Sequence, residues 1–274
     1  MKYWRYALII LLTLIAVWPV YWVIMGSFQD FGGIFTFAST LFPKNMHLNN
    51  YKGVLSSEHT LTWVGNSART VAVQCLLTLA IVTPAGMAFG LYKFPGKKII
   101  FWAFIMVIMV PGASFLIGKL LMAKRLGLTG SWWVGFIPVL FYPVGIFFFR
   151  NFVEDLPQEI LDSARIDGAG EIRILLRIIL PLCKQVMGVI LLFTCLASFN
   201  NYLWQSIVLQ KIELKTLLVG MVIQMRSLGL MAELVDPIGM RMAAGVILLI
   251  PNLTIFIFFN KYFIKDLKLG ALTK

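Results

Sequence analysis

The stretch that decides the fold is Pro157-Gln158-Glu159-Ile160-Leu161-Asp162-Ser163-Ala164-Arg165-Ile166-Asp167-Gly168-Ala169-Gly170. It is polar, whereas most of the chain consists of long apolar runs. Asp155 fits a helix cap, with Pro157 in the first turn, where its missing N–H costs nothing, and Gln158 at the capping-box position. Asp167-Gly168 is a stop signal, since glycine adopts the left-handed conformation that ends helices. The stretch therefore predicts a short, bounded helix.

The predicted helix has an apolar face made of Ile160, Leu161 and Ala164 at i, i+3 and i+4 spacing. A second helix is predicted after Gly170, with Ile172, Leu175, Leu176 and Ile179 on one stripe and Arg173 and Arg177 off it. Pro181 ends or bends this helix. A short amphipathic helix at a membrane surface suits two situations: docking into a groove on a soluble partner, or lying on lipid headgroups.

The remainder of the chain is apolar enough to place it in a membrane. Of its residues, 59% are hydrophobic and only 13% are charged, which excludes an ordinary soluble domain. The chain contains six long runs without a charged residue, with lengths of 24, 23, 20, 24, 26 and 19 residues. About 20 apolar residues cross the hydrocarbon core of a bilayer, so each run is long enough to span it.

The sequence thus predicts an all-α integral membrane protein with one domain over residues 1–274. The predicted spans are 7–28, 68–92, 99–118, 131–149, 186–208 and 242–260, with a loop at 150–184 and a tail at 261–274. With six spans both termini share a side, and that side holds 14 of the 24 Lys and Arg residues. Basic residues favour the cytoplasmic side, which predicts a multi-pass protein of the cell membrane with both termini and the loop in the cytoplasm.

Several functions are disfavoured by what the sequence contains. The three cysteines and two histidines have no metal-ligand spacing, and no Ser/His/Asp or paired-carboxylate cluster predicts an enzyme. The segment from Gly112 to Lys119 has the wrong spacing for a phosphate-binding loop, so any ATPase would be a separate subunit. The net charge of +12 favours anionic lipid surfaces, and its scattered distribution makes nucleic acid an unfavourable partner.

The fifth predicted span is the richest in polar groups. Asn200, Asn201, Tyr202 and Trp204 place amide, hydroxyl and indole groups near its outer end. Polar groups at that depth must pair with another helix or line a wet cavity. Neutral donors beside aromatic rings suit a sugar pathway, and the four residues are candidates for it. Hydrogen bonds between helices, with an aromatic belt at the membrane surface, form the alternative.

Two smaller patterns concern packing and charge. Gly86 and Gly90 form a Gly-x-x-x-Gly pair, for which close helix packing is the favoured interpretation. Arg226 and Arg241 flank the last external segment. Arg241 either extends to the membrane surface or joins Arg226 in favouring an anionic sugar.

The loop resembles the cytoplasmic loop of binding-protein-dependent ABC importer permeases of the maltose type. That family has an acidic-Ala-Ala triplet, a glycine four residues on and an Ile-x-Leu-Pro end. Here these stand as Asp162-Ser163-Ala164, Gly168 and Ile178-Ile179-Leu180-Pro181, and the first two positions depart from Glu-Ala. The resemblance implies the type I importer permease fold, with a coupling helix between spans four and five. Its residues for coupling to the ATPase are Glu159, Asp162, Ser163, Ala164, Arg165, Asp167 and Gly168.

The resemblance also implies function and partners. The chain is expected to be a permease subunit importing a carbohydrate, an oligosaccharide and possibly an acidic one, and to bind no cofactor itself. ATP and Mg²⁺ would be bound by a separate ATPase dimer. A second, different permease subunit, an extracytoplasmic solute-binding protein and membrane lipid are the other expected partners. The tail resembles the family's ending at Gly270-Ala271, with Asp266 where glycine is usual. An ATP-independent secondary carrier or channel is the alternative, although the six runs lack the carboxylate or His that ion coupling usually needs.

Overall fold

The computed structural model describes residues 2–29, 46–229 and 237–270, and every regular element in these ranges is helical. The chain forms two compact units, one from Met1–Val64 with Thr216–Leu253 and one from Gly65–Lys215 with Thr254–Lys274. The first contains α1 (Lys2–Gly26), α4 (Asn49–Leu55) and α14 (Leu217–Gly229). Two long helices, α5 (Thr60–Leu91) and α15 (Pro237–Gly270), contribute residues to both units.

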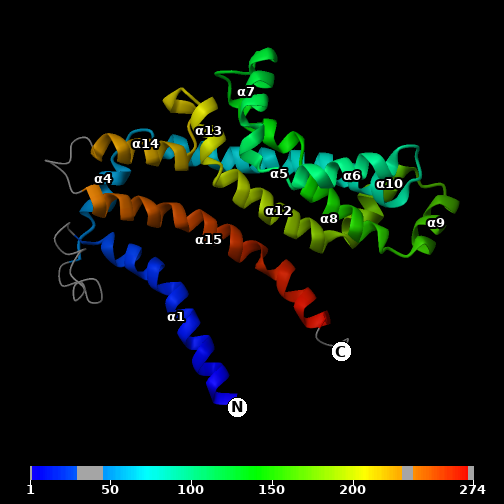
Figure 1. Cartoon of the computed structure of the whole chain (residues 1–274), viewed down its shortest axis with the longest axis horizontal. Helices are drawn as coiled ribbons and strands as arrows, with labels where there is room; N and C mark the ends of the chain where they lie inside the picture. Colours follow the sequence, from blue (N-terminus) through cyan, green and yellow to red (C-terminus); the bar gives the residue numbers. More distant parts are fainter. Residues whose placement is uncertain (1, 30–45, 230–236, 271–274) are drawn as a thin grey trace. The chain divides into compact units, whose positions relative to one another are not determined.

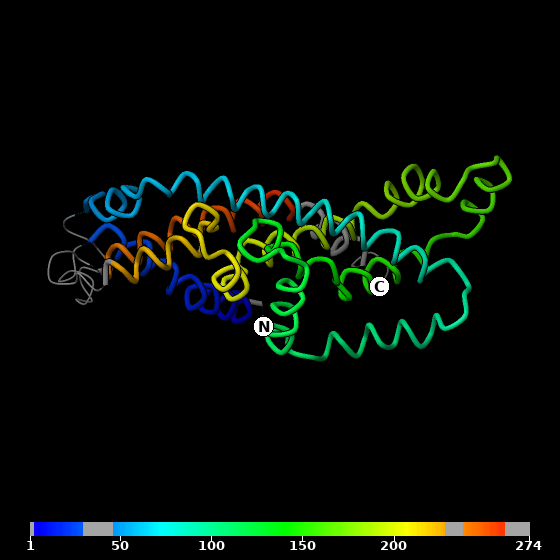
Figure 2. The backbone as a smooth tube through the Cα atoms, turned by 90° about the horizontal axis from the view of Figure 1, so that it is seen from above, coloured from blue at the N-terminus to red at the C-terminus, as the bar shows by residue number. Residues whose placement is uncertain are grey.

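The second unit holds most of the shorter helices (Figure 1). They are α6 (Lys97–Ile108), α7 (Leu116–Arg125), α8 (Pro143–Glu154), α9 (Gln158–Ile166), α10 (Glu171–Ile174), α11 (Leu180–Leu182), α12 (Lys184–Phe199) and α13 (Tyr202–Val208). Three 3₁₀ segments join them, at Gly112–Phe115, Trp132–Leu140 and Ile212–Leu214. Both views place α9 and α10 together at one end of this unit (Figure 1 and Figure 2).

Among the described residues, three continuous helices are long and apolar enough to cross a membrane: Tyr3–Gly26, Thr60–Leu91 and Ile238–Asn260. Three bent helix pairs raise the number to six if each pair is one span. Five of the predicted spans overlap these segments. The predicted span 186–208 overlaps α12 but also covers the break at 200–201 and α13, and the count of six stays a prediction.

The bends occur where proline interrupts the backbone. The predicted span at 99–118 is two helices, Lys97–Ile108 and Gly112–Arg125, which meet at 107°. Pro111 lies in the break, has no N–H to continue the helix and pushes the residue before it out of the helical region. Pro143 begins α8 at a second bend, of 46°. Neither of these two apolar runs is therefore one continuous helix.

The second unit is held together by a close approach of α5 and α8. A Cβ on Gly86 would lie 2.7 Å from Phe149 Cδ1 and 3.1 Å from the backbone N of Arg150, and one on Gly90 would lie 3.2 Å from Val153 Cγ1. Phe149 and Val153 are fully buried at this contact. The absence of a side chain therefore lets the two backbones meet, which confirms the packing interpretation of the Gly-x-x-x-Gly pair.

Candidate functional site

The helix α9 begins at Gln158, directly after Pro157, and has no side-chain cap. Asp155, predicted as that cap, is instead the C-terminal flanking residue of α8. The capping prediction was wrong because α8 continues beyond the predicted end of the span at residue 149 and reaches Glu154, which places Asp155 on the preceding helix.

The end of α9 confirms the predicted stop. Gly168 has a φ of +77°, its N–H donates to Arg165 O at 3.0 Å, and the N–H of Ala169 donates to Ala164 O at 3.0 Å. This pair of bonds is the Schellman motif, which satisfies the last carbonyls of a helix and needs a left-handed residue at this position. No atom lies within 4 Å of a Cβ built on Gly168, so its φ alone favours glycine there.

The inner face of α9 consists of Leu161, which is 1% exposed, and half-buried Ala164. Ile160, predicted on the same face, is 42% exposed. Leu161 and Ala164 are three residues apart and share the inward face, and the α-helical turn directs Ile160 outward. The i, i+3 part of the prediction was correct and the i, i+4 part was wrong.

The second predicted helix also differs from its pattern. It consists of α10, a π-helical segment at Leu175–Ile179 and α11. Ile174 and Ile179 are fully buried, whereas Ile172 and Leu176 are exposed, so the predicted stripe was wrong for these two. The π segment has an i→i+5 repeat, and this repeat places residues five apart on one face in place of the expected 3.6-residue period. At Cys183 the chain then turns by 84° into α12.

The buried residues of the loop belong to the main core of the second unit. Leu161, Ile174 and Ile179 pack in one cluster with residues of α5, α8 and α12. Those partners include Met87, Phe149, Val153 and Ile190. Burying a large aliphatic side chain contributes about 1.5–3 kcal/mol, so the loop is anchored to three long helices.

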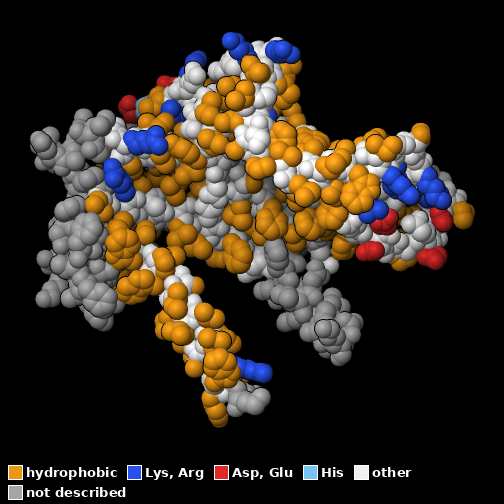
Figure 3. Space-filling model, viewed as in Figure 1, with side chains coloured by type: hydrophobic (Ala, Val, Ile, Leu, Met, Phe, Trp, Pro, Cys, Tyr) orange, Lys and Arg blue, Asp and Glu red, His pale blue; other side chains and the backbone are white. Residues whose placement is uncertain are grey.

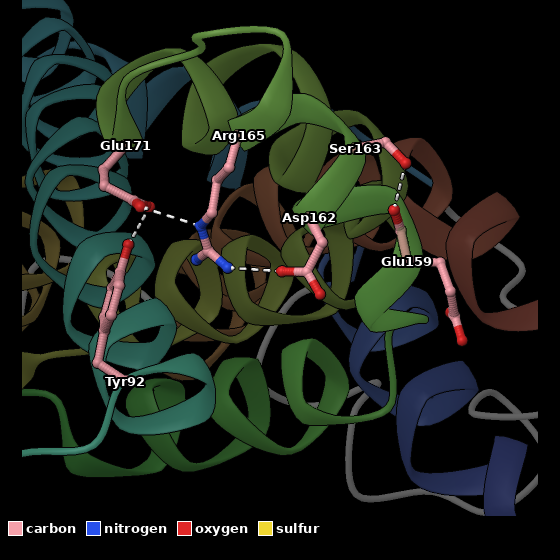
Figure 4. A network of polar contacts seen from close by, with 6 residues as sticks. All are labelled: Tyr92, Glu159, Asp162, Ser163, Arg165 and Glu171. Carbon is pink, nitrogen blue, oxygen red and sulfur yellow. Dashed lines mark hydrogen bonds and ion pairs between the residues drawn. The ribbon is translucent and has the colours of Figure 1, made fainter.

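A polar network closes the loop above this core (Figure 4). Arg165 Nε lies 3.2 Å from Glu171 Oε1, and Arg165 Nη1 lies 3.2 Å from Asp162 Oδ1. The hydroxyl of Tyr92, just after α5, donates to the Glu171 carboxylate. Glu171 raises the pKa of the Arg165 guanidinium, which keeps it charged. The network therefore joins the end of α9, the start of α10 and the end of α5.

The outer surface of the loop combines apolar and charged side chains. Ile166 is 86% exposed, Ile172 75% and Leu176 56%. Charged residues surround them, and Figure 3 shows both signs gathered over this end of the unit. The exposed predicted coupling residues are Glu159, Asp162, Ser163, Arg165, Asp167 and Gly168. An open hollow of about 810 Å³ lies alongside, lined by residues that include Glu171, Ile172, Arg173 and Leu176.

The second candidate region is the break after α12. The helix ends at Phe199, and α13 starts at Tyr202. Asn200 is exposed and its Nδ2 donates to Leu196 O at 2.9 Å. Trp204 is 3% exposed, and its Nε1 donates to Val134 O at 3.1 Å. Asn201 and Tyr202 are half-buried.

Two hollows meet at Asn201. One, of about 90 Å³, is lined by Gln74, Pro138, Val139, Tyr142, Thr194, Ala197, Ser198 and Asn201. The other, of about 270 Å³, is lined by Gly112, Ala113, Leu116, Lys119, Pro138, Asn201, Leu203 and Trp204. Ser198 is 2% exposed, and its Oγ has no hydrogen-bond partner in the part of the chain that the structure describes. Since a buried hydroxyl costs free energy unless it is satisfied, this small hollow suits water or a ligand hydroxyl.

Reasoning from the sequence missed several of these residues. Gln74 and Thr194 lie in the middle of apolar runs, and Gln74 Nε2 donates to Gly135 O at 3.0 Å. Their polarity within a span was a usable signal. Nothing local links Tyr92 to Glu171, because 79 positions separate them. Within the described ranges no three His, Cys, Asp or Glu side chains group to hold a metal ion. The predicted tail contact falls partly on Ala271 to Lys274, which lie outside the described residues.

Comparison with known proteins identifies the family. Residues 82–269 match the family described as "Binding-protein-dependent transport system inner membrane component". The chain is 31% identical to the arabinooligosaccharides transport system permease protein AraQ of Bacillus subtilis (strain 168) over 268 residues, which cover 95% of this chain and 92% of AraQ. It is 28% identical to the galactooligosaccharides transport system permease protein GanQ of the same organism over 275 residues, covering 97% and 93%.

A solved structure shows the same fold. It is the crystal structure of a bacterial ABC transporter involved in the import of the acidic polysaccharide alginate, with a TM-score of 0.81, 18% identity and 96% of each chain covered. The chain is thus a multi-pass inner-membrane transport subunit and not an enzyme. It belongs to the family of binding-protein-dependent transport system inner membrane components, the permease subunits of ABC importers.

Proposed function

We propose that this permease carries an oligosaccharide, neutral or acidic, from outside the cell to the cytoplasm. Support comes from its relatives, whose names specify arabinooligosaccharides, galactooligosaccharides and maltodextrin. It would pair with a second, different permease subunit and receive solute from an extracytoplasmic binding protein. A separate ATPase dimer would bind ATP and Mg²⁺.

The loop between α8 and α12 would be the coupling element for that ATPase. One observation carries this proposal: in the most polar part of the chain, Ile166, Ile172 and Leu176 are largely exposed. Apolar side chains grouped at a surface mark an interaction site, and here charged residues frame them, which suits a protein groove better than lipid. Glu159, Asp162, Ser163, Asp167 and Gly168 would lie at this interface. Ala164 faces the inner side, and Arg165 holds the loop closed.

Force on the loop has a physical route into the membrane. The route runs from Leu161, Ile174 and Ile179 into α5, α8 and α12 through shared buried contacts. Close-packed side chains transmit displacement because they leave few voids to absorb it. Closure of an ATPase dimer around α9 would therefore move these helices together and shift the access of the pathway between the two sides.

The break after α12 would form part of the pathway wall. Asn201 lines both hollows, and we assign it the leading role, with Asn200 and Tyr202 beside it. Trp204 would line the larger hollow with its ring while its indole N–H fixes the wall to Val134. The amides can bond sugar hydroxyls, and the aromatic rings can pack on the C–H faces of a pyranose.

In this proposal the chain crosses the membrane six times, with both termini and the loop in the cytoplasm. Cysteine crosslinking tests the arrangement. Ser163 is exposed on α9, so Ser163→Cys, in a background with Cys75, Cys183 and Cys195 replaced, should crosslink to an ATPase subunit bearing a cysteine in its groove. An impermeant thiol reagent added outside intact cells should leave it unlabelled.

Two matched controls sharpen the test. Leu161→Cys lies on the buried face of the same helix and should not crosslink. Lys98→Cys is exposed at the start of α6, on the same predicted side but off the loop, and should react less. Labelling of Ser163→Cys from outside would overturn the orientation. Equal crosslinking at all three positions would count against α9 as the specific contact. Purification of the permease without any ATPase would count against coupling and favour an ATP-independent carrier.

A further inference from the structure

A hollow between α14 and α15 brings two arginines together. It has a volume of about 300 Å³, which is at the lower end of the roughly 300–1,000 Å³ typical of small-molecule sites. Arg226, in the last turn of α14, and Arg241, near the start of α15, both line it. Apart from these two side chains the lining is apolar, with Met221, Val222, Met225 and Leu248 among its residues.

The two guanidinium groups lack the ion pairs that Arg150 and Arg165 form in the second unit. Arg150 pairs with Glu154, and Arg165 pairs with Asp162 and Glu171. Arg226 and Arg241 form no ion pair or hydrogen bond with any residue in the described ranges, and both are exposed. Two like charges around one hollow repel each other, and an anion between them removes that repulsion.

The lining restricts which anion fits. A guanidinium group binds phosphate or carboxylate oxygens in a bidentate manner, so the charged part of the ligand could be either. The apolar wall offers no donor or acceptor for sugar hydroxyls, and leaving such groups unsatisfied is costly. An acyl chain, in contrast, gains from contact with this wall. The combination therefore favours an anionic amphiphile over an acidic sugar.

We infer that the hollow between α14 and α15 binds an anionic phospholipid, with the phosphate held by Arg226 and Arg241 and an acyl chain along the apolar wall. Basic pockets between transmembrane helices on the cytoplasmic side bind anionic headgroups, and Arg226 and Arg241 offer the same chemistry at the predicted external side. Arg241 directly precedes the apolar run 242–260, which is the level at which a headgroup meets the hydrocarbon region. The inference does not depend on which solute the permease carries.

Native mass spectrometry of the delipidated whole importer, titrated with phosphatidylglycerol, tests this site. Arg226→Gln and Arg241→Gln should each raise the Kd of the most tightly bound phosphatidylglycerol molecule roughly fivefold. The double variant should raise this Kd about 25-fold. The double variant Arg226→Lys with Arg241→Lys keeps both positive charges, so its affinity for phosphatidylglycerol should fall much less. Arg125→Gln removes an exposed arginine from the end of α7 and should leave the Kd unchanged.

Three further probes identify the ligand class. Phosphatidylcholine with the same acyl chains should bind more weakly, because its headgroup has no net charge. Glycerol phosphate should not displace phosphatidylglycerol, because it lacks the acyl chain. A uronic-acid trisaccharide should also fail to displace it. Displacement by the trisaccharide would assign the arginines to the solute pathway, and displacement by glycerol phosphate would reduce the site to a phosphate site. Equal Kd values for phosphatidylglycerol in Arg125→Gln and in the double variant would exclude a lipid site at Arg226 and Arg241.

Discussion

The loop between α8 and α12 and the break between α12 and α13 are both polar interruptions of an apolar chain, and they use polarity in opposite ways. In the loop, apolar residues anchor the inner face while charged and apolar side chains remain outside. In the break, the amide of Asn200 and the indole of Trp204 donate to backbone carbonyls, and Asn201 borders two hollows.

The difference follows from the surroundings of each region. Water can solvate the outer face of the loop, so charge there is inexpensive and exposed apolar groups are the unusual feature. Near the membrane interior an unpaired polar group is costly. The unusual feature there is the buried hydroxyl of Ser198, which has no hydrogen-bond partner among the described residues. The informative residue is thus apolar in one region and polar in the other.

The largest expected effect is the loss of stability when the buried side chain that anchors α9 is removed. Leu161→Ala leaves a cavity under α9, and such substitutions cost roughly 2–5 kcal/mol. We expect a lower unfolding temperature in detergent and faster amide hydrogen exchange over residues 158–166. Ile160→Ala is the matched control, because its side chain is 42% exposed, and should stay within about 0.5 kcal/mol of the parent. Equal losses in the two variants would contradict the assignment of the inner face.

A substitution at the end of α9 separates coupling from folding. Gly168→Val places a β-branched residue at a φ of +77°, which costs at least roughly 1–2 kcal/mol locally. We expect uptake to fall at least tenfold and solute stimulation of ATP hydrolysis to be lost, while membrane insertion is retained.

The matched control for this substitution is Gly170→Ala. Gly170 has an extended backbone, with φ −69° and ψ 159°, so alanine fits there without strain. Solute-stimulated ATP hydrolysis that is equal in Gly168→Val and Gly170→Ala would remove the basis for assigning α9 a coupling role.

The smallest expected effect sharpens the assignment within the break. Trp204→Phe keeps an aromatic side chain but replaces the indole with a smaller phenyl ring and removes the N–H bond to Val134 O. The lost hydrogen bond alone costs about 1 kcal/mol, so the unfolding temperature should fall by a few degrees. Asn201→Ala should instead reduce uptake with little change in stability. Reversed results, with Asn201 affecting stability and Trp204 affecting only uptake, would exchange the two roles.

The sequence predicted the features that depend on a single residue or on the mean hydropathy of a long segment. The apolar runs indicated where the long helices lie, Gly168 indicated the end of α9, and Gly86 with Gly90 indicated close packing. Features that depend on where a helix begins or ends, on its exact periodicity, or on contacts between residues far apart in the sequence were missed. Asp155 had the right chemistry for a cap, but α8 extended past its predicted end. The predicted stripe of Ile172 and Leu176 had the right period for a continuous α-helix, but the helix changes from α to π at Leu175.

That π segment at Leu175–Ile179 has a consequence for related chains. A π turn holds about one residue more than an α turn, and one residue corresponds to about 100° of rotation in an α-helix. A relative with one residue fewer at this place would keep a continuous helix but turn α10 by about that angle. Ile174 would then leave the core, and different side chains would face outward from α10 without a single substitution. The length of this segment therefore controls which residues α10 exposes, and under the proposed coupling role it would also change the fit to the ATPase subunit.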